Sequence, residues 1–268
     1  MAETHIHPTA IVEDGATLAD GVSIGPFSVV GRDVTLGEGV VLHSHAVVAG
    51  RTTIGARTEI FPFASIGHKP QDLKYKGEPS TLSIGTDCMI REGVTINPGT
   101  EGGGMTTTVG NGCAFLANSH VGHDCHVGNN VIFSNNVMLA GHVEVGDFAI
   151  LGGGAAVIQF ARVGDHAFLG GMSGLEQDLI PYGMALGNRA YLSGLNIVGL
   201  KRRGFSASQI HDLRRAYRLL FAEEGTLLER VDDVAQEFRD HPTVMEIIAF
   251  IRAGGKRSMC TPKHAADA

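Results

Sequence analysis

Residues 109–175 read VGNGCAFLANSHVGHDCHVGNNVIFSNNVMLAGHVEVGDFAILGGGAAVIQFARVGDHAFLGGMSGL, and every sixth residue of this stretch is apolar. The same step of six, taken from Ile6 to Ile66, meets eleven aliphatic residues. Ile84, Ile90 and Ile96 lie at the same step between the two runs. An alignment of 26 apolar positions by chance is negligible, so the chain contains an internal repeat of six residues.

A period of six fits neither a helix nor a simple strand alternation. It indicates a short flat strand followed by a turn, and Gly often follows the repeat residue, as in Ile24-Gly25, where it permits unusual turn dihedrals. Three such hexads make a triangular coil of 18 residues, and stacked coils form three parallel sheets. The sequence therefore predicts a mainly β fold, a parallel β-helix with the repeat residues inside.

Three of the four cysteines fall two residues before a repeat position, where small side chains point inward. These are Cys88, Cys113 and Cys125. We expect buried structural thiols there rather than catalytic ones.

The repeat is interrupted twice and then ends. Residues 67–83 and 97–108 lose the apolar period, contain Pro and Gly, and are expected to form two loop excursions. Beyond residue 190 the pattern becomes helical: Ser206 and Thr226 each begin a capping box, and Pro242 opens a third segment that Gly254 stops. We therefore predict a β-helix domain over 1–190 and a small helical domain over 191–268.

Composition excludes several classes of function. With 21 Lys and Arg against 28 Asp and Glu, the formal net charge of −7 disfavours binding to nucleic acid. No run of about 18 apolar residues predicts a membrane span, and the N-terminus lacks a signal-peptide pattern. Four cysteines without metal-site spacing favour a reduced, cytoplasmic protein.

Histidines gather in one short stretch. His120, His123 and His126 occur within seven residues, and His142 follows His123 by 19 residues, one coil plus one residue. His123 and His142 should therefore lie close together on successive coils, with Asp124 beside them. The cluster has three interpretations: exposed turn histidines without a role, a zinc site like that of hexapeptide-repeat carbonic anhydrases, or a general base. We expect the general base and no metal.

Four segments narrow the interpretation. QDLKYKGEP (71–79), SHVGHDCHVG (119–128), LAGHVEVGDFAILGG (139–153) and NIVGLKRRGF (196–205) resemble, in order, the signature segments of the UDP-N-acetylglucosamine O-acyltransferase family. The resemblance implies a left-handed prism and a homotrimer with active sites between subunits. It also implies transfer of a 3-hydroxyacyl chain from acyl carrier protein to the glucosamine 3-position of the UDP-sugar, the first step of lipid A synthesis, without a cofactor.

The resemblance also implies residue roles. His123 would be the general base, Asp124 would fix its tautomer, and the Gly141 N–H would stabilise the oxyanion. A second set would line the sugar and acyl site: Asp72, Lys74, His120, His142 and Gln159. A third set would serve the nucleotide, its phosphates or the carrier's phosphopantetheine: Asn196, Arg202 and Arg203. The Lys201–Arg203 cluster would also attract the acidic carrier protein, and Gly171 would leave room for a longer acyl chain.

The sequence departs from the family pattern at three places. Ile158 replaces a frequent His, Asn97-Pro98 replaces a His-Arg pair, and Val198 replaces a frequent Glu. These departures leave open a 3-amino acceptor, which would give an amide product. The rivals fit less well, because N-acyltransferases of the pathway carry an N-terminal uridine-binding domain and serine acetyltransferases place their helices before the repeats. A noncatalytic β-helix scaffold would need no histidine cluster.

Overall fold

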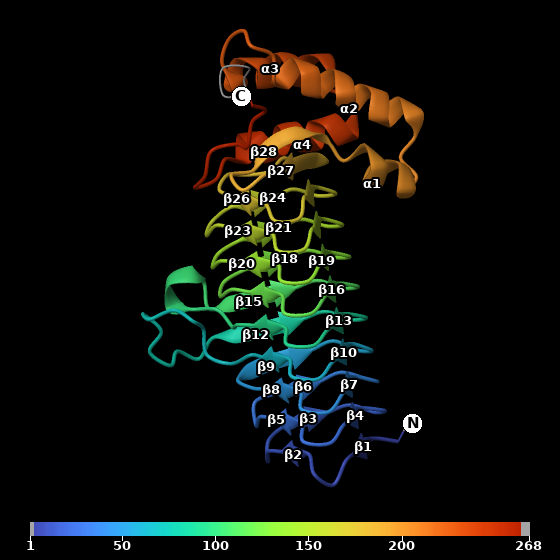
Figure 1. Cartoon of the computed structure of the whole chain (residues 1–268), viewed down its shortest axis with the longest axis vertical. Helices are drawn as coiled ribbons and strands as arrows, with labels where there is room; N and C mark the ends of the chain where they lie inside the picture. The colour runs from blue at the N-terminus through green and yellow to red at the C-terminus, as the bar shows by residue number, and fades with distance from the viewer. Residues whose placement is uncertain (1–2, 264–268) are drawn as a thin grey trace.

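The computed structural model describes residues 3–263, which form an elongated β-helix with four α-helices at its C-terminal end (Figure 1). The described strands fall into three sheets, parallel throughout except where β27 meets β28. The first sheet contains β1 (His5–Ile6), β4 (Ser23–Ile24), β7 (Val41–Leu42), β10 (Glu59–Ile60), β13 (Met89–Ile90), β16 (Ala114–Phe115), β19 (Ile132–Phe133), β22 (Ile150–Leu151), β25 (Phe168–Leu169), β27 (Gly183–Leu186) and β28 (Tyr191–Leu195).

The second sheet contains β2 (Ile11–Val12), β5 (Val29–Val30), β8 (Val47–Val48), β11 (Ser65–Ile66), β14 (Thr95–Ile96), β17 (His120–Val121), β20 (Met138–Leu139), β23 (Ala156–Val157) and β26 (Gly174–Leu175). The third contains β3 (Thr17–Leu18), β6 (Thr35–Leu36), β9 (Arg51–Ile54), β12 (Thr81–Ile84), β15 (Thr106–Val109), β18 (His126–Val127), β21 (Glu144–Val145) and β24 (Arg162–Val163). The chain turns a corner after each strand. We name these corners 1–2, 2–3 and 3–1 after the sheets they join.

The hydrophobic core fills the interior of the prism, as the repeat predicted, and continues among the C-terminal helices. Ile6 pairs with Ile24, which pairs in turn with Leu42, so the 18-residue coil sets the register. All 26 repeat positions are buried except Ile6, Val12 and Leu18 in the first coil, which no earlier coil covers. Cys88, Cys113 and Cys125 are buried free thiols, and burial raises the pKa of Cys125 to about 12. The left-handed β-helix is therefore the fold.

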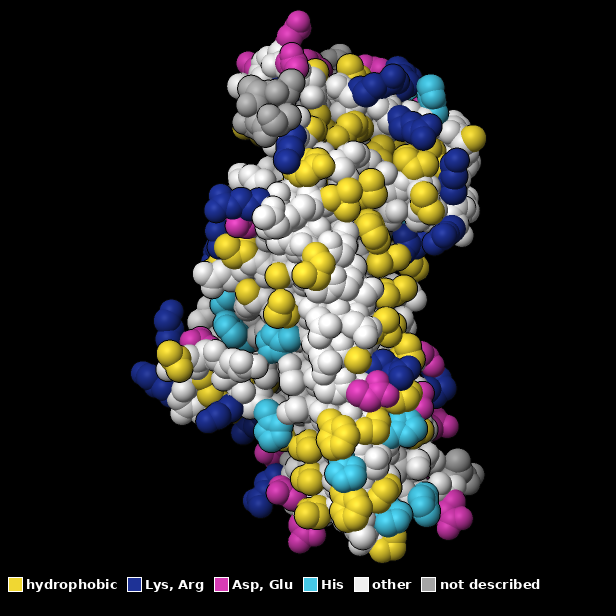
Figure 2. All heavy atoms as spheres, viewed as in Figure 1, with side chains coloured by type: hydrophobic (Ala, Val, Ile, Leu, Met, Phe, Trp, Pro, Cys, Tyr) yellow, Lys and Arg dark blue, Asp and Glu magenta, His cyan; other side chains and the backbone are white. Residues whose placement is uncertain are grey.

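The outer surfaces of the sheets differ in polarity. In the first sheet, the outward residues of successive coils are apolar over much of its length: Met89, Ala114, Ile132, Ile150 and Phe168. In the third sheet, the outward residues of the same coils are polar: Thr108, His126, Glu144 and Arg162. Figure 2 shows hydrophobic side chains spread along the viewed face of the β-helix.

Both excursions leave the prism at corner 2–3, and both project from the same side of the molecule (Figure 1). The first joins β11 to β12, and the second joins β14 to β15 through a 3₁₀ turn, η1 (Glu101–Gly103). Each is shorter than its expected range, because the chain rejoins the third sheet at Thr81 and Thr106. The Asn97 amide donates a hydrogen bond to the carbonyl of His68 at 3.2 Å and so links the two excursions.

The C-terminal end is helical, with α1 (Ile197–Arg202), α2 (Ala207–Leu220), α3 (Leu227–Glu237) and α4 (Pro242–Ala253). Both predicted capping boxes are present, at Ser206 and at Thr226, and Pro242 opens α4. The first sheet extends to Leu195, so the division into domains at residues 190 and 191 stays a prediction. Among the described residues, no helix is both long and apolar enough to cross a membrane.

Candidate active site

Corner 2–3 stacks polar and aromatic rings on successive coils. Asp124, His142 and Phe160 occupy the same turn position, with φ of 58°, 62° and 65°. The His142 ring stacks on Phe160 with centroids 4.4 Å apart, and its edge meets the His123 ring at 4.9 Å. The predicted proximity of His123 and His142 is confirmed, because one coil plus one residue returns the chain to the same corner.

His123 and Asp124 form a hydrogen-bonded pair within one chain. The Nδ1 of His123 lies 2.8 Å from Oδ2 of Asp124. The carboxylate is completely buried, whereas the imidazole keeps 18% of its surface exposed. With Nδ1 held by the carboxylate, Nε2 is the nitrogen left to accept a proton. This arrangement is the geometry of a general base and its orienting acid.

The Asp124 carboxylate has a second set of partners in the excursion below it. Thr100 donates its backbone N–H to Oδ1 at 2.8 Å and its hydroxyl to Oδ2 at 2.6 Å. The backbone N–H of Asp124 donates to the hydroxyl of Thr107 at 2.8 Å. Neither threonine has a role predicted from the sequence. Thr100 lies in the excursion, whose contacts cannot be counted from the period, and Thr107 lies just after it in β15.

Gly141 lies against the imidazole of His123. A Cβ added at Gly141 would stand 2.5 Å from both Cε1 and Nε2 of the ring, so only glycine leaves room for the observed position. Its backbone N–H has no acceptor among the described residues. An unpaired N–H therefore lies on the same coil edge as the free nitrogen of the base.

The two neighbouring histidines are biased toward the neutral form. Burial lowers the pKa of His120, and the nearby His123 lowers it further. Burial also lowers the pKa of His142, against the opposing effect of Asp124. His120 is further oriented by Thr95, whose hydroxyl lies 2.7 Å from Nδ1. Neutral rings of this kind can exchange hydrogen bonds with an uncharged sugar.

The other residues predicted at the sugar and acyl site lie around the same corner. Asp72 lies in the first excursion, and its charge raises the pKa of His142 in opposition to the lowering by burial. The Asp72 carboxylate accepts the backbone N–H of Lys74 at 3.0 Å, and the Lys74 side chain is exposed. Gln159 is exposed beside Phe160, and its carbonyl accepts a bond from Arg257 at 3.0 Å.

The residues predicted to serve the nucleotide or the carrier lie elsewhere, at corner 3–1. Arg203 donates to the carbonyl of Phe148 at 2.7 Å, and burial lowers its pKa. Asn196 caps α1 and donates to the carbonyl of His166 at 2.9 Å. Arg202 is exposed. Within the described residues, the buried Nη1 of Arg203 and Nδ1 of His166 have no hydrogen-bond partner.

Gly171 lies at the third edge of the prism, corner 1–2, on an exposed turn. A Cβ there would stand 3.2 Å from the carbonyl oxygen of Gly153. The sets of site residues that were predicted from the sequence thus occupy three different edges of one prism, and a single chain does not bring them together.

The three departures from the family pattern have distinct surroundings. Ile158 packs partly buried against the core, and Val198 is 61% exposed on α1. Asn97 is buried and holds the excursions together, while its Oδ1 lacks a partner within residues 3–263. Within the part of the chain that the structure describes, none of the three forms a hydrogen bond with His123 or Asp124.

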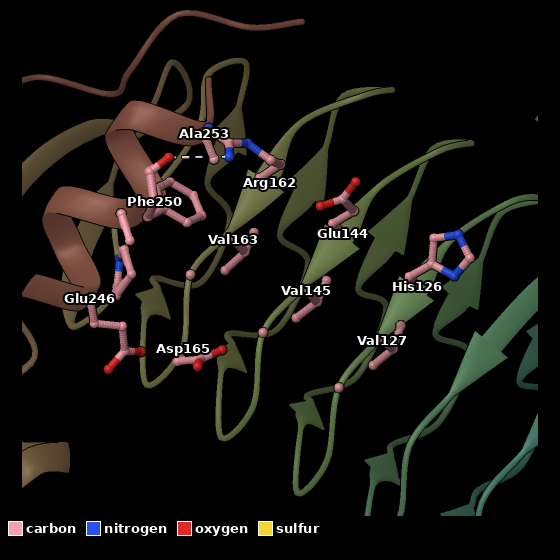
Figure 3. Close-up of a pocket in the computed structure, with 15 residues that line it drawn as sticks. His126, Val127, Glu144, Val145, Arg162, Val163, Asp165, Glu246, Phe250 and Ala253 are labelled. Atoms are coloured by element: carbon pink, nitrogen blue, oxygen red, sulfur yellow. Dashed lines mark hydrogen bonds between the residues drawn. The ribbon is translucent and has the colours of Figure 1, made fainter. Parts of the chain in front are cut away.

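Two cavities lie near the third sheet. One, of about 610 Å³, is lined by Asp124, His142 and Phe160 and, on another side, by Gly254–Lys256. The other, of about 680 Å³, lies between α4 and the outward row of His126, Glu144 and Arg162 (Figure 3). The larger cavity is lined by neither His123 nor Asp124, whereas the smaller one is lined by Asp124 and His142, and His126 lines both. His126 points outward from β18 with its Nδ1 2.9 Å from the Thr108 hydroxyl.

Among the described residues, one group has donor atoms close enough together to hold a metal ion: His123, Asp124 and His142, with ligand atoms within 4.8 Å of one another. The Nδ1 of His123 is already bonded to the carboxylate, and Thr100 occupies both carboxylate oxygens. These bonds fit a proton-transfer pair better than a metal site.

Comparisons with known proteins agree with this geometry. A family model described as UDP N-acetylglucosamine O-acyltransferase, domain 2, matches residues 178–260. A model of bacterial transferase hexapeptide repeats matches residues 15–50 and 106–141. An acyl-[acyl-carrier-protein]–UDP-N-acetylglucosamine O-acyltransferase of Methylobacterium radiotolerans is 72% identical over 264 residues, covering 98% of this chain and 97% of the relative. That of Brucella ovis is 50% identical over 262 residues, covering 98% and 94%.

Solved structures agree as well. The UDP-N-acetylglucosamine acyltransferase of Francisella novicida superposes with a TM-score of 0.94 at 33% identity, covering 98% of this chain and 96% of that one. The UDP-N-acetylglucosamine O-acyltransferase of Moraxella catarrhalis superposes with a TM-score of 0.92 at 40% identity, covering 95% and 98%.

Proposed function

This chain belongs to the UDP-N-acetylglucosamine O-acyltransferase family, and from that premise we propose that His123 is the general base of its reaction. The enzyme is an acyltransferase that moves an acyl chain from acyl carrier protein to UDP-N-acetylglucosamine, the first step of lipid A synthesis. We propose that the acyl chain is a 3-hydroxyacyl chain and that it goes to the glucosamine 3-position. The observation that carries the assignment of the base is the bond between the imidazole and a fully buried carboxylate.

The proposed chemistry begins with proton transfer. The Nε2 of His123 takes the proton of the sugar 3-hydroxyl as its oxygen attacks the thioester carbonyl. Asp124 holds the tautomer and stabilises the imidazolium that forms. The oxyanion accepts a hydrogen bond from the Gly141 N–H, whose lack of a protein acceptor supports this role. When the tetrahedral species collapses, the phosphopantetheine sulfur leaves and takes the proton from His123.

We propose that His120, His142, Asp72, Lys74 and Gln159 bind the sugar and the acyl end of the donor. Their support is a common place around corner 2–3. No cofactor is proposed beyond the phosphopantetheine that arrives on the carrier protein.

We propose that Asn196, Arg202 and Arg203 serve the nucleotide, its phosphates or the phosphopantetheine. The buried, unpartnered Nη1 of Arg203 supports an anionic ligand there, because a buried charged donor without an acceptor is costly. The exposed Arg202 and Lys201 offer the clearest positive surface for an acidic carrier protein.

We propose a homotrimer because the three sets of predicted site residues lie on three different edges of a single prism. Stacking prisms side by side would bring corner 2–3 of one subunit toward another edge of its neighbour. The apolar outward row of the first sheet, with Ile132 37% exposed, supports burial against a second copy. We expect a trimer mass in solution, and a fully active monomer would contradict the proposal. We also propose a cytoplasmic location, in keeping with buried free thiols.

The acceptor atom is proposed to be the 3-hydroxyl oxygen. The alternative is a 3-amino sugar, which would give an amide through the same base. Offering both UDP-sugars with 3-hydroxyacyl carrier protein distinguishes them by the product formed.

The test of the base compares two histidines. His123→Ala should lower turnover at least about 10²–10⁴-fold, the usual contribution of general-base catalysis, and leave donor affinity unchanged. His126→Ala is the matched control, because His126 points outward from the next strand and bonds only Thr108. Equal damage from both variants would refute the assignment of the base, and no damage from either would refute the mechanism.

A further inference from the structure

We propose that Thr100 is a positioning residue for the base: it holds the Asp124 carboxylate toward His123 and does not itself touch the substrate. The inference rests on the proposed function of the His123–Asp124 pair. Thr100 lies in the Gly-rich excursion one coil below that pair, immediately before η1.

The contact is bidentate. The Thr100 N–H donates to Oδ1 of Asp124 at 2.8 Å, and the Thr100 hydroxyl donates to Oδ2 at 2.6 Å. Oδ2 is also the oxygen bonded by Nδ1 of His123 at 2.8 Å. One carboxylate oxygen therefore joins the threonine hydroxyl to the imidazole, and the orientation of the ring depends on both bonds.

The excursion also seals the carboxylate from water. The Thr100 carbonyl accepts the backbone N–H groups of Gly103 at 3.1 Å and Met105 at 2.9 Å, which closes a tight turn. Gly103 then packs directly on the carboxylate, since a Cβ at Gly103 would stand 2.0 Å from Cγ of Asp124. The Asp124 side chain has no exposed surface, so bulk water cannot supply the bond that the Thr100 hydroxyl gives.

The Thr100 hydroxyl also affects which of two imidazoles, His123 or His142, the Asp124 carboxylate bonds. The Nδ1 of His142 lies 3.9 Å from the same Oδ2 that bonds His123. Without the Thr100 hydroxyl, Oδ2 loses one of its two donors, and the single N–H bond to Oδ1 fixes the carboxylate plane less firmly between His123 and His142. With it, two bonds to Thr100 fix the carboxylate plane, and the 2.8 Å bond goes to His123.

The hydroxyl has a second, electronic effect. A donor on Oδ2 withdraws charge that would otherwise stabilise the protonated imidazole. Removing the donor should let the pair as a whole hold its proton more tightly, whichever residue carries it. The acid limb of the pH–rate profile should then move to higher pH.

Thr100→Val tests the hydroxyl, because valine keeps the side-chain shape and the backbone N–H bond. We expect turnover to fall about 10- to 100-fold, the usual worth of a hydrogen bond to a charged group. The Michaelis constants of both substrates should stay unchanged, because Thr100 is buried and lines neither cavity. Thr100→Ser keeps the hydroxyl and should restore most of the turnover and the wild-type pH profile.

Thr106→Val is the matched control, because its hydroxyl belongs to the exit of the same excursion and bonds Thr81 instead of Asp124. Its turnover and pH profile should equal those of the wild type. The Thr100→Val change should also add little to His123→Ala, because a positioning residue has nothing to position once the base is gone.

Several outcomes would overturn the inference while wild-type acyl transfer stands. Wild-type turnover in Thr100→Val would do so, as would a loss with an unmoved pH profile or a loss fully additive with His123→Ala. A matching loss in Thr106→Val would show that the excursion acts only through its fold. Failure of the proposed function is separate, because then the wild-type enzyme itself would not transfer the acyl chain.

Discussion

Gly141→Ala perturbs the base without removing any catalytic atom. The added Cβ would stand 2.5 Å from Cε1 and Nε2 of His123, whereas carbon atoms in ordinary contact are about 3.5–4.0 Å apart. The ring must therefore retreat by about 1 Å. It cannot retreat freely, because its Nδ1 is bonded to Asp124 at 2.8 Å and its ring packs against that of His142 with centroids 4.9 Å apart. A displacement of about 1 Å costs roughly 10²-fold in rate.

The assay is steady-state acyl transfer with both substrates varied, together with thermal unfolding. We expect Gly141→Ala to lose about 10²-fold in turnover, with little change in the unfolding midpoint, because a side chain rather than backbone yields. Gly31→Ala is the control: Gly31 lies at the same corner, far down the prism, and its Cβ would meet nothing closer than 3.4 Å.

A double variant separates two causes of that loss. If the alanine acts by displacing the base, Gly141→Ala should add little to His123→Ala. If it instead disturbs the oxyanion donor, the two losses should multiply. Wild-type turnover in Gly141→Ala would refute the view that glycine is required by the position of the ring.

Four further predictions follow from other parts of the molecule. Raising salt should raise the Michaelis constant for the acyl carrier, and Arg202→Ala should weaken that dependence, since exposed charges are screened beyond about 8–10 Å; an unchanged dependence would exclude this surface. Activity should survive chelation, and a loss restored by zinc would favour a metal site at His123, Asp124 and His142. Gly171→Met should shift preference to shorter acyl chains, measured with carriers of graded chain length. Burial raises the pKa of Glu246 from 4.5 to about 7, so the folded chain binds this proton more tightly than the unfolded chain. The stability that the protonated Glu246 contributes is therefore lost as pH rises through the folded-state pKa. Glu246→Gln should flatten the resulting fall in the unfolding midpoint between pH 5 and 8.

The fold could be predicted from the sequence because a repeat of six residues extends over most of the chain. A repeat of six fixes which residue points inward, and three hexads fix the register, so Ile24 must pair with Leu42 without further information. Capping boxes at Ser206 and Thr226 were readable for the same reason, since their partners lie three residues away. The short helix α1 was not predicted, because six residues are too few to show a helical period.

The site was readable only where it follows the repeat. His123 and His142 could be brought together by counting, since both lie on regular coils. Thr100 could not, because the excursion that carries it obeys no period and its bonds to Asp124 depend on a turn closed by Gly103. The sequence shows that Arg203 carries a charge, but it does not show that the side chain is half-buried and bonded to the carbonyl of Phe148.

The position of the excursions explains why the regular part of the chain needs them. A β-helix corner exposes its turn residues, and Asp124 at such a corner would be hydrated if the coil below were regular. At an exposed carboxylate, water competes with the imidazole as a hydrogen-bond donor, so the carboxylate orients the ring poorly. The second excursion leaves the prism at the same corner, one coil below, and covers this carboxylate with Thr100 and Gly103. The irregular segment thus supplies the burial that the repeat, by its own geometry, cannot give to a residue on its edge.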